Sequence, residues 1–190
     1  MTSPETERRL AAVEAQLAIQ QLAFRYAIAV DSRDLDAWAD CFRPDVDLGR
    51  AGAGRDALKR HIEPLLRTFG RSVHHVTGHR IELRGDAEAT GTVYCRAEHE
   101  VDDRWIVMAI CYADEYVRLD GEWFLSRRRE RHWYAADVAD RPQAVDFADW
   151  APAGRPALPE AFPTWGAFWG DGAASPAAVD PPNEKENGTP

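Results

Sequence analysis

Residues 73–134 read VHHVTGHRIELRGDAEATGTVYCRAEHEVDDRWIVMAICYADEYVRLDGEWFLSRRRERHWY, and this stretch decides the fold class. Short turns that contain Asp or Gly, at 84–86, 102–103 and 120–121, divide it into four long segments. Because such turns join neighbouring strands in opposite directions, the stretch predicts a strongly curved antiparallel sheet. The predicted strands are Val73–Leu83, Ala87–Val101, Trp105–Leu119 and Glu122–Tyr134.

Helical patterns dominate the residues before the sheet. The first predicted helix, Glu5–Val30, has one apolar stripe, and two shorter helices are predicted over Leu35–Phe42 and Arg55–Phe69. Asp34 can cap the second helix, Pro64 weakens the second half of the third, and a short strand is predicted over 46–48. The stripe of the first helix consists of Leu10, Val13, Leu17, Phe24 and Ile28.

Helices followed by a meander of strands are the pattern of an α+β fold. The expected architecture is a cone-shaped, curved sheet, antiparallel or mixed, that wraps around a pocket and is covered by three N-terminal helices. One such domain is predicted over residues 1–140. Residues 141–172 are rich in aromatic side chains and are expected to dock on this domain or on a neighbouring subunit. Residues 173–190 are Pro-rich and polar and are predicted to be disordered.

Composition restricts the partners. The net charge of −9 argues against nucleic acid, because phosphate contacts need clustered Lys and Arg. No segment approaches the roughly 18 apolar residues of a membrane span, and the N-terminus lacks a secretory pattern, so no membrane contact and a cytoplasmic location are predicted. Cys41, Cys95 and Cys111 are widely spaced and are expected to be buried thiols in a reducing compartment.

Asp31 and Tyr26 are the first candidates for chemistry. Asp31 follows the apolar run Ala27–Val30, where a carboxylate is either a solvated turn residue or a buried base. Tyr26 lies five residues earlier, about 140° away around a helix, so both side chains could reach one cavity.

Histidines form the second group of candidates. His74 and His75 open the first strand, so alternation turns one of them toward the pocket and the other outward. His74 precedes the 84–86 turn by nearly as many residues as His99 follows it, so the two are expected to lie close together on neighbouring strands. Two histidines in one cavity wall could transfer protons near neutral pH. A metal site from His74, His75 and His79 is disfavoured, because alternation puts His74 on the face opposite the other two, and no metal is predicted.

Arg128 lies in the last strand, where an arginine either holds a carbonyl or anionic oxygen or belongs to a solvated basic face. The chain has no GxGxxG, no phosphate-binding loop and no GxSxG nucleophile elbow, so neither nucleotide binding nor a serine hydrolase is predicted.

The order and spacing of several stretches resemble the SnoaL-like branch of the nuclear transport factor 2-like superfamily, from about Glu5 to Tyr134. Within this branch the chain is similar to scytalone dehydratase, hexachlorocyclohexane dehydrochlorinase and bile-acid 7α-dehydratase. The resemblance implies elimination by an Asp–His pair without a metal or an organic cofactor. The stretches that carry the likeness are 25–42, 74–87, 112–116 and 120–128.

The resemblance also implies roles. The aspartate of these enzymes falls on Asp31, the histidine on His74, a tyrosine on Tyr26 and a second histidine on His99, which with His74 is a candidate to protonate the leaving hydroxyl. The tyrosines of the scytalone enzyme would fall at Val30 and Leu48, so its substrate is not implied. The predicted substrate-binding residues are Arg128, Trp38, His75 and Tyr112.

The implied function is a cofactor-independent dehydratase that eliminates water next to a carbonyl of a hydrophobic polycyclic substrate, such as a hydroxysteroid or a polyketide. The alternatives are an isomerase, a polyketide cyclase, or a non-catalytic ligand-binding or assembly protein. A homodimer or a homotrimer is expected.

Overall fold

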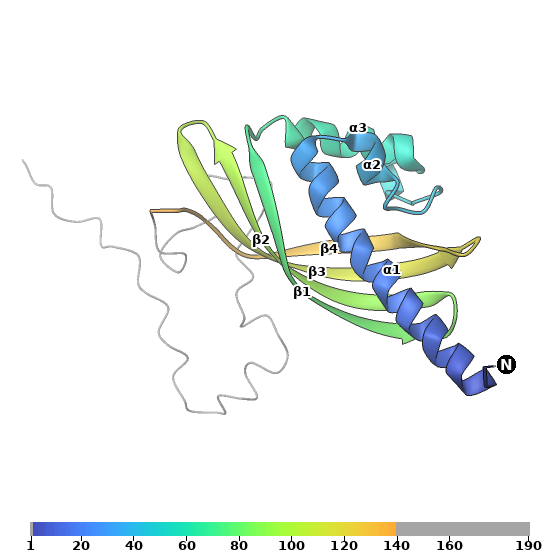
Figure 1. The fold of residues 1–190 in the computed structure, drawn as a ribbon. Coiled ribbons are helices and arrows are strands. Elements are labelled where there is room, and N and C mark those ends of the chain that lie inside the picture. Colours follow the sequence, from blue (N-terminus) through green and yellow to red (C-terminus); the bar gives the residue numbers. More distant parts are fainter. Residues whose placement is uncertain (1, 140–190) are drawn as a thin grey trace, which may run out of the picture.

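The computed structural model describes residues 2–139. The segment 141–172 and the tail 173–190 lie outside the described residues, so their docking and disorder stay predictions. Within 2–139 the chain forms helices first and a meander second, which confirms the α+β class (Figure 1). The elements are α1 (Pro4–Ser32), α2 (Leu35–Ala39), the 3-10 helix η1 (Gly49–Ala51), α3 (Arg55–Leu66), β1 (Ser72–Arg84), β2 (Glu88–Val101), β3 (Arg104–Leu119) and β4 (Glu122–Asp137).

The sheet is wholly antiparallel, in the order β1-β2-β3-β4, as the short turns predict. Figure 1 shows long, curved strands with α1 running across them and α2 and α3 gathered at one end. The turn residues Asp102 and Asp120 have positive φ, a conformation that Asp tolerates. Because of the strand order, β1 and β4 are the two edge strands and lie on opposite sides of the curved sheet.

A β-bulge between Val76 and Gly78 changes the alternation of β1. His79 pairs with Val93 and, like His74, points toward the helices, whereas His75 points to the outer face. The prediction that His75 and His79 share a face is therefore wrong, because the bulge adds one residue between them.

Helix α1 begins and ends with caps. Ser3 accepts a hydrogen bond from the backbone of Thr6, and Arg33 takes the left-handed conformation that ends the helix. The predicted apolar stripe is not the buried face: Leu10, Val13, Leu17 and Ile28 are 56%, 53%, 55% and 68% exposed. The buried residues are Ile19, Leu22, Ala23, Tyr26, Ala27, Ala29 and Val30.

The two other helices differ from prediction at their C-terminal ends. Asp34 caps α2 as expected, but α2 stops at Ala39 because Phe42 bridges to Leu125 of β4. Helix α3 passes through Pro64 and ends at Leu66 rather than at Phe69. The predicted strand over 46–48 is reduced to one isolated bridge, Asp47 to Ala53.

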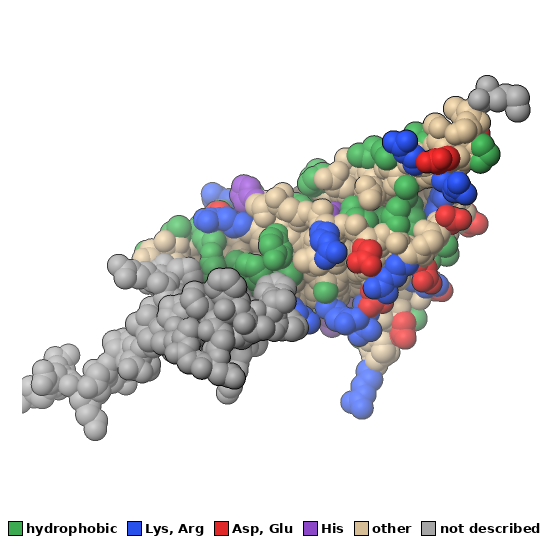
Figure 2. Space-filling view, turned by 90° about the horizontal axis from the view of Figure 1, so that it is seen from below, with side chains coloured by type: hydrophobic (Ala, Val, Ile, Leu, Met, Phe, Trp, Pro, Cys, Tyr) green, Lys and Arg blue, Asp and Glu red, His purple; other side chains and the backbone are tan. Residues whose placement is uncertain are grey.

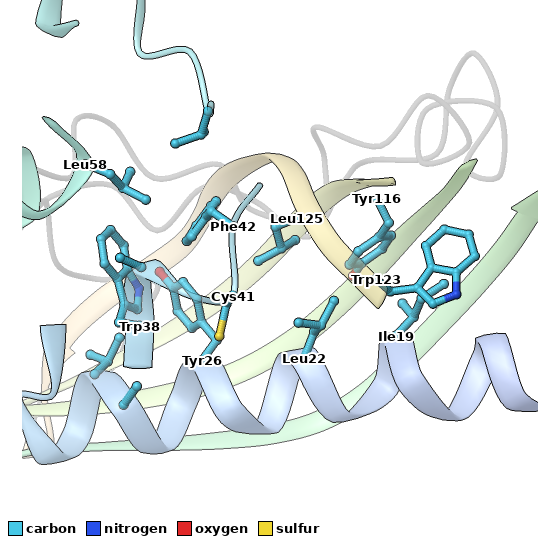
Figure 3. Packing of buried hydrophobic residues seen from close by; sticks show 14 of the residues in the cluster. Ile19, Leu22, Tyr26, Trp38, Cys41, Phe42, Leu58, Tyr116, Trp123 and Leu125 are labelled. Carbon is cyan, nitrogen blue, oxygen red and sulfur yellow. The ribbon is translucent and has the colours of Figure 1, made fainter. Parts of the chain in front are cut away.

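The main core lies between α1, α2, α3 and the ends of β3 and β4. Figure 3 shows Tyr26, Trp38 and Phe42 packed beside Leu22 and Leu125, with ring centroids 5.2–6.2 Å apart for the three aromatic pairs. Large buried apolar surfaces of this kind supply most of the folding free energy. This core holds the last turns of α1 in a fixed position against the sheet.

The described surface carries mixed charge. In Figure 2, Lys and Arg side chains alternate with Asp and Glu over the face that is shown. All three cysteines are free and buried, as predicted. No helix within residues 2–139 has both the length and the hydrophobicity that crossing a lipid bilayer requires.

Candidate active site

The last turn of α1 brings Asp31 against the start of β1. Its Oδ1 lies 2.6 Å from Nδ1 of His74, and its Oδ2 accepts a hydrogen bond of 2.9 Å from the backbone N–H of His74. The side chains of His74 and Asp31 are 7% and 26% exposed, so both are largely shielded from water. Two contacts to one residue fix the carboxylate and the imidazole relative to each other.

This contact assigns the tautomer of His74. An ionised carboxylate only accepts hydrogen bonds, so the proton of a neutral His74 must lie on Nδ1. Nε2 then carries the free lone pair and can act as a base. The carboxylate also stabilises the imidazolium that forms when Nε2 takes a proton.

His99 is held by a different chain of hydrogen bonds. Arg33 donates from Nη2 to Oγ of Ser72 at 2.8 Å, and Oγ of Ser72 lies 3.1 Å from Nδ1 of His99. Because Arg33 can only donate, the Ser72 hydroxyl is free to donate to Nδ1, which places the proton of His99 on Nε2. His99 thus presents an N–H group, whereas His74 presents a lone pair, with their ring centroids 5.3 Å apart.

Burial also sets the charge of His99. It lowers the pKa of this imidazole from 6.5 to about 3, and the neighbouring His74 and Arg33 act in the same direction. His99 is therefore neutral at neutral pH. It can donate a hydrogen bond to a substrate oxygen, but it does not carry the second proton that an acid would transfer.

This lowered pKa predicts that the protein loses stability as the pH falls from about 6.5 toward 3. In that pH range His99 is protonated in the unfolded chain but not in the folded chain, so acid favours unfolding. His79 and His132, whose pKa values are also lowered by burial, act in the same direction. Urea unfolding at several pH values measures the effect. His99→Phe should depend less on pH, and an unchanged dependence in this variant would contradict the assignment.

A cavity of about 50 Å³, room for only a few water molecules, lies beside the two histidines. A larger chamber of about 380 Å³ adjoins it and shares Leu66 and Phe69 as a common wall. The cavity is mostly apolar, with a few polar groups among aliphatic and aromatic side chains. Its lining residues are Tyr26, Val30, Ile62, Leu65, Leu66, Phe69, His74, His99, Met108, Ile110, Tyr112, Glu130 and His132.

Behind the cavity lies a buried charge pair. Arg128 is bidentate to Asp114, with N···O distances of 2.8 and 2.6 Å, and its guanidinium lies 4.2 Å from the ring centroids of both Tyr26 and Tyr112. Tyr116 donates to the same carboxylate at 2.7 Å. Burial raises the pKa of both cavity phenols, so Tyr26 and Tyr112 keep their protons.

Four predicted site residues are not among those that line the cavity, and one of them, Asp31, contacts the lining residue His74. Arg128 is paired with Asp114 and lies against the two tyrosine rings, so its contact with a substrate stays a prediction. Trp38 belongs to the main core. His75 lies on the outer face with Nε2 3.9 Å from Glu98, because alternation turns it away from His74. The other four predicted site residues all line the cavity: Tyr26, His74, His99 and Tyr112.

The sequence reasoning missed four residues of the site. Arg33 and Ser72 hold His99, and Glu130 and His132 line the cavity from β4. For the last two a signal was available, because alternation along a strand puts residues 128, 130 and 132 on the same face. Within residues 2–139, no group of three His, Cys, Asp or Glu side chains is placed to hold a metal ion.

Residues 11–129 match the model of the SnoaL-like domain. The chain belongs to the SnoaL-like domain family. This membership confirms the resemblance to the SnoaL-like branch of the nuclear transport factor 2-like superfamily. The SnoaL-like region extends from within α1 to the first half of β4 and therefore contains Asp31, His74 and His99.

Solved structures share this SnoaL-like fold. LinA is 26% identical, with a TM-score of 0.62 over 70% of this chain and 95% of LinA. A Novosphingobium aromaticivorans protein assigned as a scytalone dehydratase is 25% identical, with a TM-score of 0.58 over 70% of this chain and 93% of that protein. A Nostoc punctiforme protein with a cystatin-like fold is 23% identical, with a TM-score of 0.52 over 62% of this chain and 90% of that protein. No curated protein matches the chain.

Proposed function

We propose that this protein is a cofactor-independent lyase that eliminates water next to a carbonyl group. The observation that carries the proposal is the contact between Asp31 and His74 at the wall of a mostly apolar cavity. A carboxylate–imidazole pair shielded from water is suited to abstract a proton from carbon. Membership in the SnoaL-like family and similarity to LinA, a hexachlorocyclohexane dehydrochlorinase, support an elimination.

In the proposed reaction, Nε2 of His74 takes the proton on the carbon next to the carbonyl, and the electrons of that C–H bond form the enolate. Asp31 stabilises the resulting imidazolium. The enolate oxygen accepts hydrogen bonds from Nε2–H of His99 and from the hydroxyls of Tyr26 or Tyr112, which all line the cavity. Preorganised donors of this kind stabilise developing charge most strongly where water is excluded. The enolate electrons then expel the hydroxyl group on the next carbon, which must receive a proton as it leaves.

The cavity favours an uncharged, hydrophobic substrate. Its ionisable lining groups are histidines, phenols and one carboxylate. Within residues 2–139, no guanidinium is among these lining groups, and Arg128 behind the cavity is neutralised by Asp114. A polycyclic ketone is larger than about 50 Å³, so its binding requires that Leu66 and Phe69 move and join the cavity to the outer chamber.

The test uses two ring ketones as probes. With 3-hydroxy-1-tetralone, a lyase forms 1-naphthol with loss of water, whereas an isomerase forms a product of unchanged mass. With 1-tetralone, which has no leaving group, the base alone exchanges the proton next to the carbonyl for deuterium in D₂O. A protein that binds these ketones but catalyses neither reaction contradicts the proposal and favours a ligand-binding role.

Leu66→Ala should favour large substrates. Removing this side chain joins the two spaces, so kcat/KM for 3-hydroxy-1-tetralone should rise relative to kcat/KM for the small probe 4-hydroxybutan-2-one. The variant should also lose about 2–5 kcal/mol of stability, as truncation of a buried leucine does. Leu35→Ala is the matched control, because Leu35 lines only the outer chamber. An unchanged ratio for Leu66→Ala argues against this entry route.

Homo-oligomerisation and a cytoplasmic location stay predictions. So does the class of the natural substrate, a hydroxysteroid or a polyketide.

A further inference from the structure

A second histidine–carboxylate pair faces the same cavity from the opposite edge of the sheet. Nε2 of His132 lies 3.7 Å from Oε2 of Glu130, and both residues line the cavity. In the sheet register, Glu130 pairs with Tyr112 and His132 pairs with Ile110, two residues that also line the cavity. The His132 side chain is largely buried, whereas the Glu130 side chain is partly exposed.

The strand order separates the two pairs. His74 comes from β1, and Glu130 and His132 come from β4; these are the two outer strands of the four-stranded sheet. His99 on β2 and Tyr112 on β3 lie between them. A ligand in the cavity therefore has His74 toward one edge of the sheet and His132 toward the other.

The reaction needs a proton donor that the other groups do not supply. His99 was predicted to be one of two donors to the leaving hydroxyl, but its proton sits on a neutral imidazole of very low pKa. The hydroxyls of Tyr26 and Tyr112 have raised pKa values, which makes them hydrogen-bond donors and poor acids. His74 is occupied by the proton that it takes from carbon.

We propose that His132 protonates the departing hydroxyl group, with Glu130 as the positioning residue that orients it. This inference rests on the proposed lyase function and extends it to the second half of the reaction. The C–O bond breaks with its electrons on oxygen, the proton of the His132 imidazolium joins that oxygen, and water leaves. His74 ends protonated and His132 neutral, so one proton must pass back through solvent before the next turnover.

The surroundings of His132 fit a donor that gives up its proton readily. Burial lowers its pKa, and the Glu130 carboxylate acts against that shift. Its imidazolium is therefore a stronger acid than an exposed one, and the adjacent carboxylate still allows it to form. The Asp31–His74 pair, His99, Tyr26 and Tyr112 are the other titratable groups that face the cavity or its edge.

The experiment compares His132→Gln with the wild-type protein at about pH 6. Glutamine can still form hydrogen bonds but cannot transfer a proton as imidazolium does. Dehydration of 3-hydroxy-1-tetralone should fall by ~10²–10⁴-fold, the usual contribution of one positioned proton transfer. Deuterium exchange of 1-tetralone should persist, because it needs only His74. Glu130→Gln should show the same pattern with a smaller loss.

A substrate with a different leaving group tests whether His132 acts by protonating the departing hydroxyl. Chloride leaves without a proton, so His132→Gln should eliminate chloride from 3-chloro-1-tetralone at nearly the wild-type rate. The proposal would be overturned if His132→Gln lost deuterium exchange as well as dehydration activity, or if it lost hydroxide and chloride elimination equally. Full dehydration activity in His132→Gln would also overturn it. If the wild-type protein neither exchanges nor dehydrates, the proposed lyase function fails instead. His61→Gln, an exposed histidine on α3, is the control.

Discussion

Asp31→Asn is expected to lower kcat/KM for elimination by ~10²–10⁴-fold while the protein stays folded. The amide oxygen of asparagine can still accept the backbone N–H of His74, which preserves the local structure. The amide NH₂ group then faces Nδ1 of His74 and donates to it. The proton of His74 moves to Nε2, and the nitrogen that should act as the base is blocked.

Deuterium exchange of 1-tetralone should fall with dehydration in Asp31→Asn, because both start with the same proton abstraction. An unchanged thermal unfolding curve shows that the loss is chemical. Asp103→Asn, in the exposed turn between β2 and β3, is the matched control and should retain full activity. If Asp31→Asn exchanges and dehydrates at the wild-type rate, the Asp31–His74 pair is not the base.

Asp114→Ala is expected to lower the free energy of unfolding by about 3–5 kcal/mol. The side chains of Arg128 and Asp114 are only 5% and 0% exposed, so removal of the carboxylate leaves a buried, uncompensated guanidinium. Tyr116 also loses its hydrogen-bond acceptor. The free energy of unfolding in urea measures the effect, since the denaturation midpoint reports stability when the slope is unchanged.

A double variant separates the charge from the packing. Asp114→Ala combined with Arg128→Met removes both charges, so it should recover part of the stability that Asp114→Ala loses. Exposed ion pairs contribute much less, so Asp45→Ala, which breaks the surface pair with Arg43, should change stability by less than about 1 kcal/mol. If Asp114→Ala is no less stable than Asp45→Ala, the buried pair does not stabilise the fold.

The strands were the most predictable part of the fold. Asp102-Asp103 and Asp120-Gly121 form turns where expected, and each predicted strand matches an observed one within a few residues at its ends. Turn chemistry is local, so the sequence contains it directly. The buried face of α1 was less predictable: leucines and valines of its first half form a regular stripe and yet are exposed. Which face packs depends on where the sheet lies, and periodicity alone cannot supply that.

The site divides in a similar way. Asp31 and His74 were identified from the sequence through a family resemblance, and the pairing of His74 with His99 followed from their distances to one turn. Arg128 was predicted either to hold a ligand oxygen or to belong to a solvated basic face, because its partner Asp114, on the adjacent strand, could not be recognised as a buried counter-charge. His75 could not be separated from His74 before the inward face of β1 was known.

The amino-acid sequence alone was enough to predict the order of helices and strands and the antiparallel pairing. It also showed which types of side chain are available for proton transfer. Each of these features depends on residues close together in the chain or on a short turn. Tertiary structure alone decided which nitrogen of His74 and of His99 holds a proton, that Arg128 is neutralised by Asp114, and that Glu130 and His132 line the same cavity as His74. Those properties depend on contacts between distant elements, and burial and hydrogen-bond partners exist only after these elements have packed.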